Sequence, residues 1–93
     1  MIVDFADSET EKIWQGKKSA KIPPEIQRRA FTKLLIIHSA ENEDDLKIPP
    51  GNKFEHLIGN LSGYCSIRIN NQWRIQFKFH NGEACDVKIT DYH

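Results

Sequence analysis

The sequence ends on a carboxylate, a phenol and an imidazole in a row, Asp91-Tyr92-His93, directly after an apolar run that alternates as a β-strand does. Metal-free cleavage of RNA requires groups of this kind. A base removes the proton of a ribose 2′-hydroxyl, which then attacks the adjacent phosphate, while an acid protonates the leaving 5′-oxygen and a cation stabilises the developing charge. Histidine titrates near neutral pH and suits either proton-transfer role. The tail is therefore the first candidate site, provided that a cation lies beside it.

The strands that precede the tail decide what lies beside it. Apolar residues alternate with polar residues over 65–69, 73–79 and 85–89, and turns separate the three runs. Every position expected to face the core has an odd number, and directly opposed residues must share a face. A two-residue loop at Asn70-Asn71 would oppose Ile67 to Arg74, so we predict a three-residue loop, 70–72, instead.

The same argument applied to the second turn fixes the partner of the tail. We predict a three-residue loop at 81–83, with Gly82 in the left-handed conformation that hairpin turns require. Continuing this register makes the tail the end of an edge strand beside the strand that begins at Trp73. The predicted pairs are Phe79 with Cys85, Ile75 with Ile89, Trp73 with Asp91, Arg74 with Thr90, and Gln72 with Tyr92.

This register brings the tail to Arg74 at one end of a small twisted sheet. A simpler alternative is a surface ion pair between Asp91 and Arg74 with the last two residues frayed. Asp91, however, has an odd number like the residues that face the core, and a carboxylate on that face needs a partner or a function. Tyr92 could stack on an unpaired base or orient a phosphate.

The first half of the sequence predicts a short strand and two helices. Residues 2–5 are β-prone, the Ser8-x-x-Glu11 spacing is that of a capping box, and Gly16 is a stop signal, which predicts a helix over 8–15. Pro23-Pro24 opens a second helix over 24–40, and the acidic stretch 41–45 leads out of it with room for one further helical turn before a fixed loop at 48–52. The apolar stripe of the second helix consists of Ile26, Ala30, Leu34 and Ile37, widened by Phe31 and Leu35.

Composition sets outer limits on the class of protein. With 93 residues, 39% hydrophobic and 28% charged, the chain predicts one soluble domain over 1–93. No apolar run could span a membrane, and the acidic N-terminus is unlike a signal peptide, so we expect a cytoplasmic protein. Cys65 and Cys85 have no metal-site spacing and fall on strands either side of the middle one, too far apart for a disulfide. We therefore expect no metal site.

Charge is unevenly distributed although the net charge is zero. Residues 12–38 form a basic block between acidic stretches at 1–11 and 41–45. A basic face of this kind suits a polyanion such as nucleic acid. A solvated surface of mixed charge is an equally simple interpretation.

Residues 49–77, PPGNKFEHLIGNLSGYCSIRINNQWRIQF, together with the terminal DYH, closely resemble the HigB toxins of the RelE/ParE superfamily. The resemblance spans essentially the whole chain and is densest over 46–79 and 89–93. It implies an α+β, RelE/ParE-like fold of order β-α-α-β-β-β, with the two helices of the N-terminal half packed on a small twisted antiparallel sheet.

The resemblance also implies an activity and partners. It implies the toxin of a type II toxin–antitoxin system, a ribosome-dependent mRNA endoribonuclease (mRNA interferase) that cuts translated messages in the decoding site of the 70S ribosome and arrests growth. It implies a HigA-like helix-turn-helix antitoxin, operator DNA contacted only through the antitoxin complex, and no cofactor.

The site residues that the resemblance implies match the tail and its surroundings. In HigB-like toxins the terminal Asp-Tyr-His, the Arg of the Trp-Arg pair and a polar residue before that Trp form the proposed catalytic set. Some members have a further His ahead of a glycine, for which His56 is the nearest match, although the aligned position is Glu55. Which of the tail residues is the base stays open. The implied catalytic residues are Asp91, Tyr92, His93, Arg74, Gln72 and His56.

Charge adds five candidates for contact with ribosomal RNA: Lys53, Arg68, Arg28, Arg29 and Lys33.

Two other functions remain open on the same fold. One is a ParE-like toxin that inhibits DNA gyrase without catalysis, although gyrase inhibition has no use for an acid/base cluster at the tail. The other is a silent relative that only binds its antitoxin.

Overall fold

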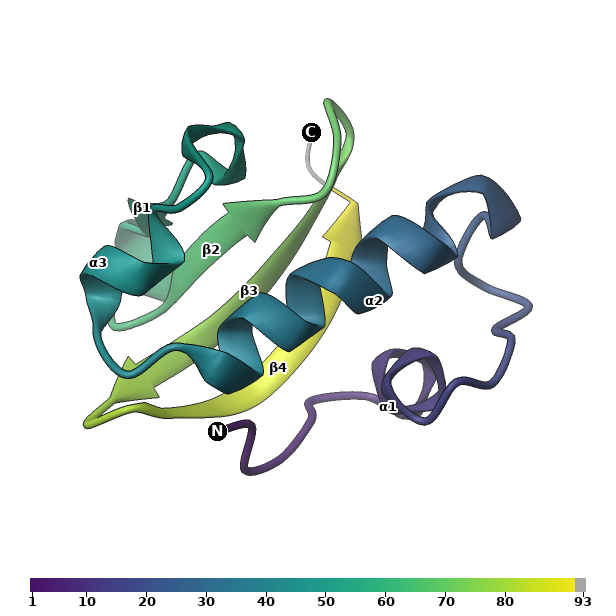
Figure 1. Cartoon of the computed structure of the whole chain (residues 1–93), viewed down its shortest axis with the longest axis horizontal. Helices are drawn as coiled ribbons and strands as arrows, with labels where there is room; N and C mark the ends of the chain where they lie inside the picture. The colour runs from purple at the N-terminus through teal and green to yellow at the C-terminus, as the bar shows by residue number, and fades with distance from the viewer. Residues whose placement is uncertain (92–93) are drawn as a thin grey trace.

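Helix α2 (Pro24–Ser39) runs across one face of a four-stranded antiparallel sheet in the computed structural model of the chain, which describes residues 1–91 (Figure 1). The strands follow one another in chain order, β1-β2-β3-β4. Tyr92 and His93 lie outside the described residues. The elements are α1 (Ser8–Trp14), α2, α3 (Glu43–Leu46), β1 (Glu55–His56), β2 (Cys65–Arg68), β3 (Trp73–His80) and β4 (Glu83–Asp91), with 3₁₀ turns at Pro50–Asn52 and Gly59–Leu61.

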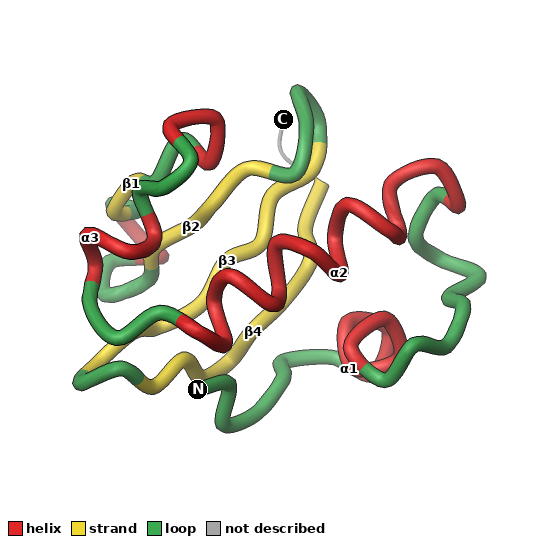
Figure 2. The backbone as a smooth tube through the Cα atoms, viewed as in Figure 1, coloured by secondary structure: helices red, strands yellow, loops and turns green. Residues whose placement is uncertain are grey.

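The predicted α+β class is confirmed, with two differences in the strands. Residues 2–5 form no regular strand but lie beside β4 in parallel, with isolated bridges from Ile2 to Ala84 and from Phe5 to Val87 (Figure 2). The second difference is β1, two residues that the sequence did not predict and that pair with the start of β2. Both segments are too short to show the alternation from which strands are predicted.

Helix α1 begins at Ser8 as predicted, but its N-cap lies one residue earlier than the capping box indicates. Asp7, not Ser8, is the N-cap: its backbone is extended and its carboxylate accepts from the Thr10 amide at 2.9 Å. The Ser8 prediction was wrong because Asp at this position makes the same bond one residue upstream. The predicted end is confirmed, since Gly16 has φ +80° and Lys17 N–H bonds to Lys12 O at 2.8 Å.

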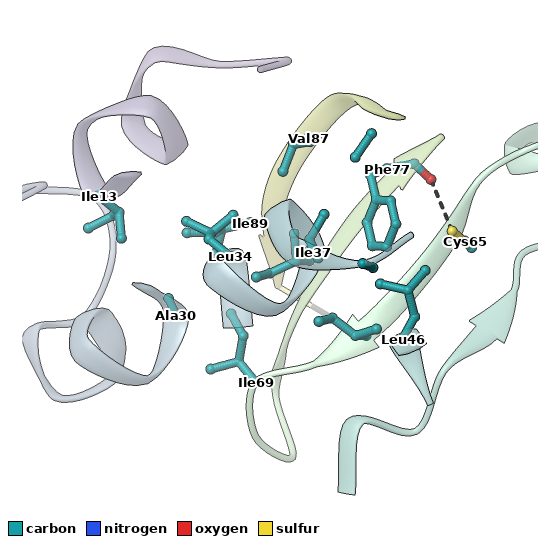
Figure 3. Packing of buried hydrophobic residues seen from close by; sticks show 14 of the residues in the cluster. Ile13, Ala30, Leu34, Ile37, Leu46, Cys65, Ile69, Phe77, Val87 and Ile89 are labelled. Atoms are coloured by element: carbon teal, nitrogen blue, oxygen red, sulfur yellow. Dashed lines mark hydrogen bonds between the residues drawn. The ribbon is translucent and has the colours of Figure 1, made fainter. Parts of the chain in front are cut away.

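Helix α2 matches its predicted range and buries its predicted stripe. Pro24 occupies the first helical turn, where its missing N–H costs nothing. Phe31 is half-buried and Leu35 is 42% exposed, so the stripe does not extend to Leu35. The core between α2 and the sheet is aliphatic with one central ring, Phe77 (Figure 3). Its helix side consists of Ile26, Ala30, Leu34 and Ile37, and its sheet side includes Ile67, Ile75, Phe77, Val87 and Ile89.

The first hairpin has the predicted register. Ile67 opposes Ile75, and Ile69 N–H bonds to Trp73 O at 2.8 Å across a three-residue loop. The Asn70 side-chain oxygen holds the loop by accepting from the amides of Gln72 and Trp73, both at 2.8 Å. The odd-numbered residues of β2 and β3 therefore face α2, and the even-numbered ones lie on the opposite face, here called the open face.

The second hairpin departs from the predicted register near its turn and matches that register at the open end of the strands. Asn81 and Gly82, with φ of 50° and 79°, form a two-residue turn, so Ala84 and not Cys85 opposes Phe79. A bulge at Asp86, φ 53°, adds the missing residue and restores the predicted pairs from Ile75–Ile89 onward. Trp73 accordingly opposes Asp91 as predicted. Cys65 on β2 is buried, Cys85 on β4 is half-buried, and both thiols are free.

Within the described part of the chain, no helix is both long and apolar enough to cross a membrane.

Candidate active site

Arg74 is the best-anchored charged side chain of the open face. It is only 7% exposed, and its guanidinium contacts Ser66, Lys53 and Glu55. Nε donates to Ser66 Oγ at 2.9 Å, one terminal nitrogen donates to the Lys53 carbonyl at 2.7 Å, and the same nitrogen lies 3.4 Å from a Glu55 carboxylate oxygen. A buried cation is stable only when paired and hydrogen-bonded, so these contacts fix its orientation.

The loop that presents the Lys53 carbonyl is itself held from within. Lys53 has φ 47° after the 3₁₀ turn, and the neighbouring Asn52 is fully buried. The Asn52 amide donates to the carbonyls of Leu46 and Ile48, each at 3.1 Å, and its oxygen accepts from Lys33 Nζ at 2.5 Å. Burial and the charge of Arg29 lower the pKa of Lys33. The structure thus places Lys33, a predicted RNA contact, on Asn52 as part of the scaffold behind Arg74.

Asp91 and Gln72 meet at the end of the β3–β4 pair. The Gln72 side-chain amide donates to Asp91 Oδ2 at 3.2 Å, and both residues are exposed. A pocket of about 240 Å³ joins Asp91 to Arg74 across the open face, and it is lined by Leu57, Leu61, Ser66, Arg74, Gln76, Thr90 and Asp91. Three predicted catalytic residues, Arg74, Asp91 and Gln72, are therefore brought together. Tyr92 and His93 follow directly but lie outside the described residues.

His56 is not brought to this pocket. Its ring nitrogen Nε2 lies 2.8 Å from Glu43 Oε1 on α3, and its ring meets Phe54 edge-on at 5.2 Å. Side chains alternate along a strand, so His56 opposes Cys65 on the α2 side while Glu55 opposes Ser66 on the side of Arg74. The residue of β1 that contacts Arg74 is therefore Glu55 and not His56.

None of the contacts that Arg74 makes with Ser66, Lys53 and Glu55 was predicted from the sequence. Ser66 is 1% exposed, and its even number already places it on the open face beside Arg74, so register alone could have identified it. The Lys53 carbonyl could not have been identified in this way, because its position depends on how the loop before β1 folds.

Basic side chains gather at the β2–β3 turn, next to the pocket that Arg74 and Asp91 line. Arg29, Lys53 and Arg68 line one hollow together with Gly51 and residues 69–71. A second hollow along α2 is lined by Arg28, Arg29 and Lys33 with Glu25 and Thr32. Since Arg68 directly opposes Arg74, the first hollow lies one strand away from the anchored guanidinium. All five candidate RNA contacts line one or other of these two hollows, and Lys33 also donates to Asn52.

Among residues 1–91, no three His, Cys, Asp or Glu side chains are grouped so as to hold a metal ion. What the described groups offer instead is a fixed cation, an exposed carboxylate oriented by an amide, and a second carboxylate on the cation. Such a set can bind a phosphate and move a proton beside it.

Comparison with known proteins places these features in a family. The family model described as RelE-like toxin of type II toxin–antitoxin system HigB matches residues 3–93. The chain is 46% identical over 93 residues to Toxin HigB-1 of Vibrio cholerae, covering 99% of this chain and 98% of the relative. It is 29% identical over 93 residues to Endoribonuclease HigB of Proteus vulgaris, covering all of both proteins.

Solved structures share the fold at low sequence identity. A mutant of YafQ from E. coli superposes with a TM-score of 0.60 at 16% identity, covering 98% of this chain and 91% of that one. The YoeB/ParE toxin from Agrobacterium tumefaciens gives a TM-score of 0.51 at 21% identity, with coverage of 99% and 96%. The arrangement of helices and sheet described above is therefore that of this group of toxins.

Proposed function

The chain belongs to the HigB-like family of RelE-like toxins of type II toxin–antitoxin systems, and from that premise we propose that it arrests growth as a metal-free endoribonuclease acting on translated mRNA. The observation that carries the proposal is the Arg74 guanidinium, which is buried and anchored in a pocket that Asp91 also lines. The name of the Proteus vulgaris relative, an endoribonuclease aligned over its whole length, supports the same activity.

In the proposed reaction Arg74 holds the scissile phosphate. Its contacts with Ser66 and Lys53 pre-orient the guanidinium, so binding a phosphate costs little reorganisation. The guanidinium then stabilises the negative charge that builds on the phosphate oxygens as the fifth bond forms. Arginine suits this task better than lysine because its donors form a rigid planar fork.

Proton transfer is assigned to the tail. A base removes the 2′-hydroxyl proton, the 2′-oxygen attacks phosphorus, and the bond to the 5′-oxygen breaks as an acid protonates it, leaving a 2′,3′-cyclic phosphate and a 5′-hydroxyl. Asp91, oriented by Gln72, and His93 share these two steps, and Tyr92 positions the substrate. His56, engaged with Glu43, acts from outside the pocket if it acts at all.

Ribosome dependence is part of the proposal and rests on charge. Arg28, Arg29, Lys53 and Arg68 give the surface beside the pocket a concentration of cations suited to ribosomal RNA backbone. The proposed partner in the resting state is a HigA-like antitoxin, and operator DNA is reached only through that complex. We place the protein in the cytoplasm, where translated messages are found.

The deciding experiment is mapping of mRNA 5′ ends after brief induction of the intact chain, of Arg74→Ala and of a chain without His93. We expect in-frame cuts within translated codons that disappear in both variants. Lys12→Ala serves as a control, because it removes an exposed cation of α1 that lies outside the pocket and outside both basic hollows, and it should leave the pattern of cuts unchanged.

Intact messages alongside growth arrest would overturn the proposal. DNA damage signalling in such cells would then favour a gyrase inhibitor, and absence of any growth defect would favour a silent relative. Cuts that persist on untranslated RNA would refute ribosome dependence alone.

A further inference from the structure

The pocket beside Arg74 is lined by four residues, Leu57, Leu61, Gln76 and Thr90, to which the proposed reaction gives no role. Gln76 and Thr90 come from the sheet, and Leu57 and Leu61 come from the loop that joins β1 to β2. Gln76 and Thr90 are half-buried, and within residues 1–91 neither side chain makes a hydrogen bond to the protein. The amide and the hydroxyl are therefore available to hydrogen-bond a ligand in the pocket.

The strands set Gln76 at a fixed place relative to Arg74. The two residues are neighbours on the open face of β3, about 7 Å apart along the strand. Gln76 lies between Ser66 on β2 and Lys88 on β4, whereas Arg74 lies between Arg68 and Thr90. A group bound at Gln76 is therefore separated from a phosphate at Arg74 by roughly the length of one sugar.

The two leucines give the pocket an apolar wall. The loop is closed by the Leu57 N–H to Tyr64 carbonyl bond and the Tyr64 N–H to Leu61 carbonyl bond, both 2.9 Å. Leu61 remains 38% exposed and Leu57 is half-buried although both line the pocket. An apolar wall facing an amide and a hydroxyl suits a flat ring with polar edges.

Size narrows the choice of ligand. The volume of about 240 Å³ is below the roughly 300–1,000 Å³ typical of sites for whole drug-sized ligands. A single nucleobase fits this description: its faces are apolar, its edge carries donors and acceptors, and it is joined through a sugar to a phosphate. The side-chain amide of glutamine both donates and accepts and is a recurrent partner of base edges.

We propose that this pocket binds the nucleobase adjoining the scissile phosphate, with Gln76 reading its edge and Leu57 and Leu61 packing on its face. The inference rests on the proposed function, since it assumes an RNA phosphate at Arg74. It makes Gln76 a determinant of sequence preference in cleavage and not a participant in proton transfer.

The test compares cleavage preferences of the wild-type chain with Gln76→Leu and Leu61→Ala by mRNA 5′-end mapping after induction. Removing the amide should change the ratio of cleavage between the best and second-best base next to the cut by about tenfold or more. Two matched controls are Gln15→Leu, at the exposed end of α1, and Leu35→Ala, on exposed α2, which should both cut like wild type. A Gln76→Leu variant with unchanged base ratios and undiminished cleavage would overturn the inference while leaving the nuclease intact.

If a variant or the wild type does not cut RNA, a second measurement still tests whether the pocket binds a nucleobase. Titration of the purified protein with AMP, GMP, CMP and UMP, followed by NMR, should shift the Gln76 amide and Leu61 methyl signals but not those of Gln15 and Leu35. Ribose 5-phosphate, which lacks a base, should leave Gln76 unmoved. If none of the four nucleotides moves the Gln76 signal at millimolar concentration, the base pocket is refuted. If a nucleotide does move it while the wild type fails to cut, the pocket stands and the proposed nuclease activity falls.

Discussion

On strand β3, Ile75 and Phe77 are fully buried beneath α2, whereas their neighbours Arg74 and Gln76 point to the open face. The α2 side holds aliphatic and aromatic groups packed on one another. The open side holds groups that need partners, and Arg74 finds its own in a hydroxyl, a carbonyl and a carboxylate. One strand therefore contributes its odd residues to stability and its even residues to chemistry, and variants on the two faces should fail in different ways.

Phe77→Ala should produce the largest loss of stability. Phe77 is fully buried at the centre of the core, and truncation of a buried phenylalanine typically costs about 3–5 kcal/mol of unfolding free energy. Urea unfolding of the purified protein measures this value. Lys78→Ala, one residue along and exposed, is the matched control and should cost less than about 0.5 kcal/mol. Equal losses for both would remove the distinction between the two faces.

Arg74→Ala should produce the largest loss of cleavage. Removal of a preorganised group that stabilises developing charge lowers the rate about 10²–10³-fold, and Arg74→Lys should recover only part of it because lysine lacks the planar fork. Single-turnover cleavage of mRNA on the ribosome measures both rates. An Arg74→Ala protein that folds and cuts within threefold of wild type would refute the assignment of Arg74.

Cys65 gives the covered face a dependence on alkaline pH. Burial first, and then the charge of Glu43, raises the pKa of its thiol from 9.0 to about 12. Above pH 9 the unfolded chain loses the proton that the folded chain retains, so the free energy of unfolding should fall with rising pH, by up to about 1.4 kcal/mol per unit. Urea unfolding between pH 8 and pH 10.5 should show this slope reduced in Cys65→Ala. An identical slope in that variant would contradict the prediction.

Asp7→Ala should produce the smallest effect of the four. Loss of the N-cap bond to the Thr10 amide destabilises α1 by about 1 kcal/mol. Ser8→Ala should change the unfolding free energy by no more than a few tenths, because Ser8 is not the cap. Both variants, once folded, should cut RNA at the wild-type rate. A larger loss from Ser8→Ala than from Asp7→Ala would restore the capping box that the sequence predicted.

Periodicity was sufficient for the long elements and for the final register. The range of α2, its buried stripe and the pairing of Trp73 with Asp91 all follow from the spacing of apolar residues. The tip of the second hairpin was wrong, yet its base was right, because a turn shorter by one residue is followed by a bulge longer by one. Matching the faces of the two strands fixes only the total number of residues in the turn and the bulge together. The preference of Asn-Gly for two-residue turns was the feature of the sequence that could have identified the shorter turn.

The site was predictable where it lies on regular strands and not where it lies on loops. Arg74, Asp91 and Gln72 come together because register brings them together. Glu55 and the Lys53 carbonyl reach Arg74 through a loop whose course depends on the buried amide of Asn52, and no local pattern reports such a tertiary contact. His56 was a candidate from the resemblance alone, and its two-residue strand shows no alternation from which its face could have been predicted; in the structure its ring lies against Glu43.

The parallel segment at the N-terminus has a consequence for how copies of the chain meet. An exposed sheet edge is a template on which another chain can pair, and such pairing leads to aggregation. Here residues 1–6 hydrogen-bond along part of β4, with Val3 N–H on the Ala84 carbonyl at 2.8 Å and Ala6 N–H on the Val87 carbonyl at 2.9 Å. The opposite edge consists of the two residues of β1 and the last two residues of β2, which β1 does not cover. Within residues 1–91, the unpaired edges of the sheet are therefore short, which disfavours edge-to-edge pairing of two copies.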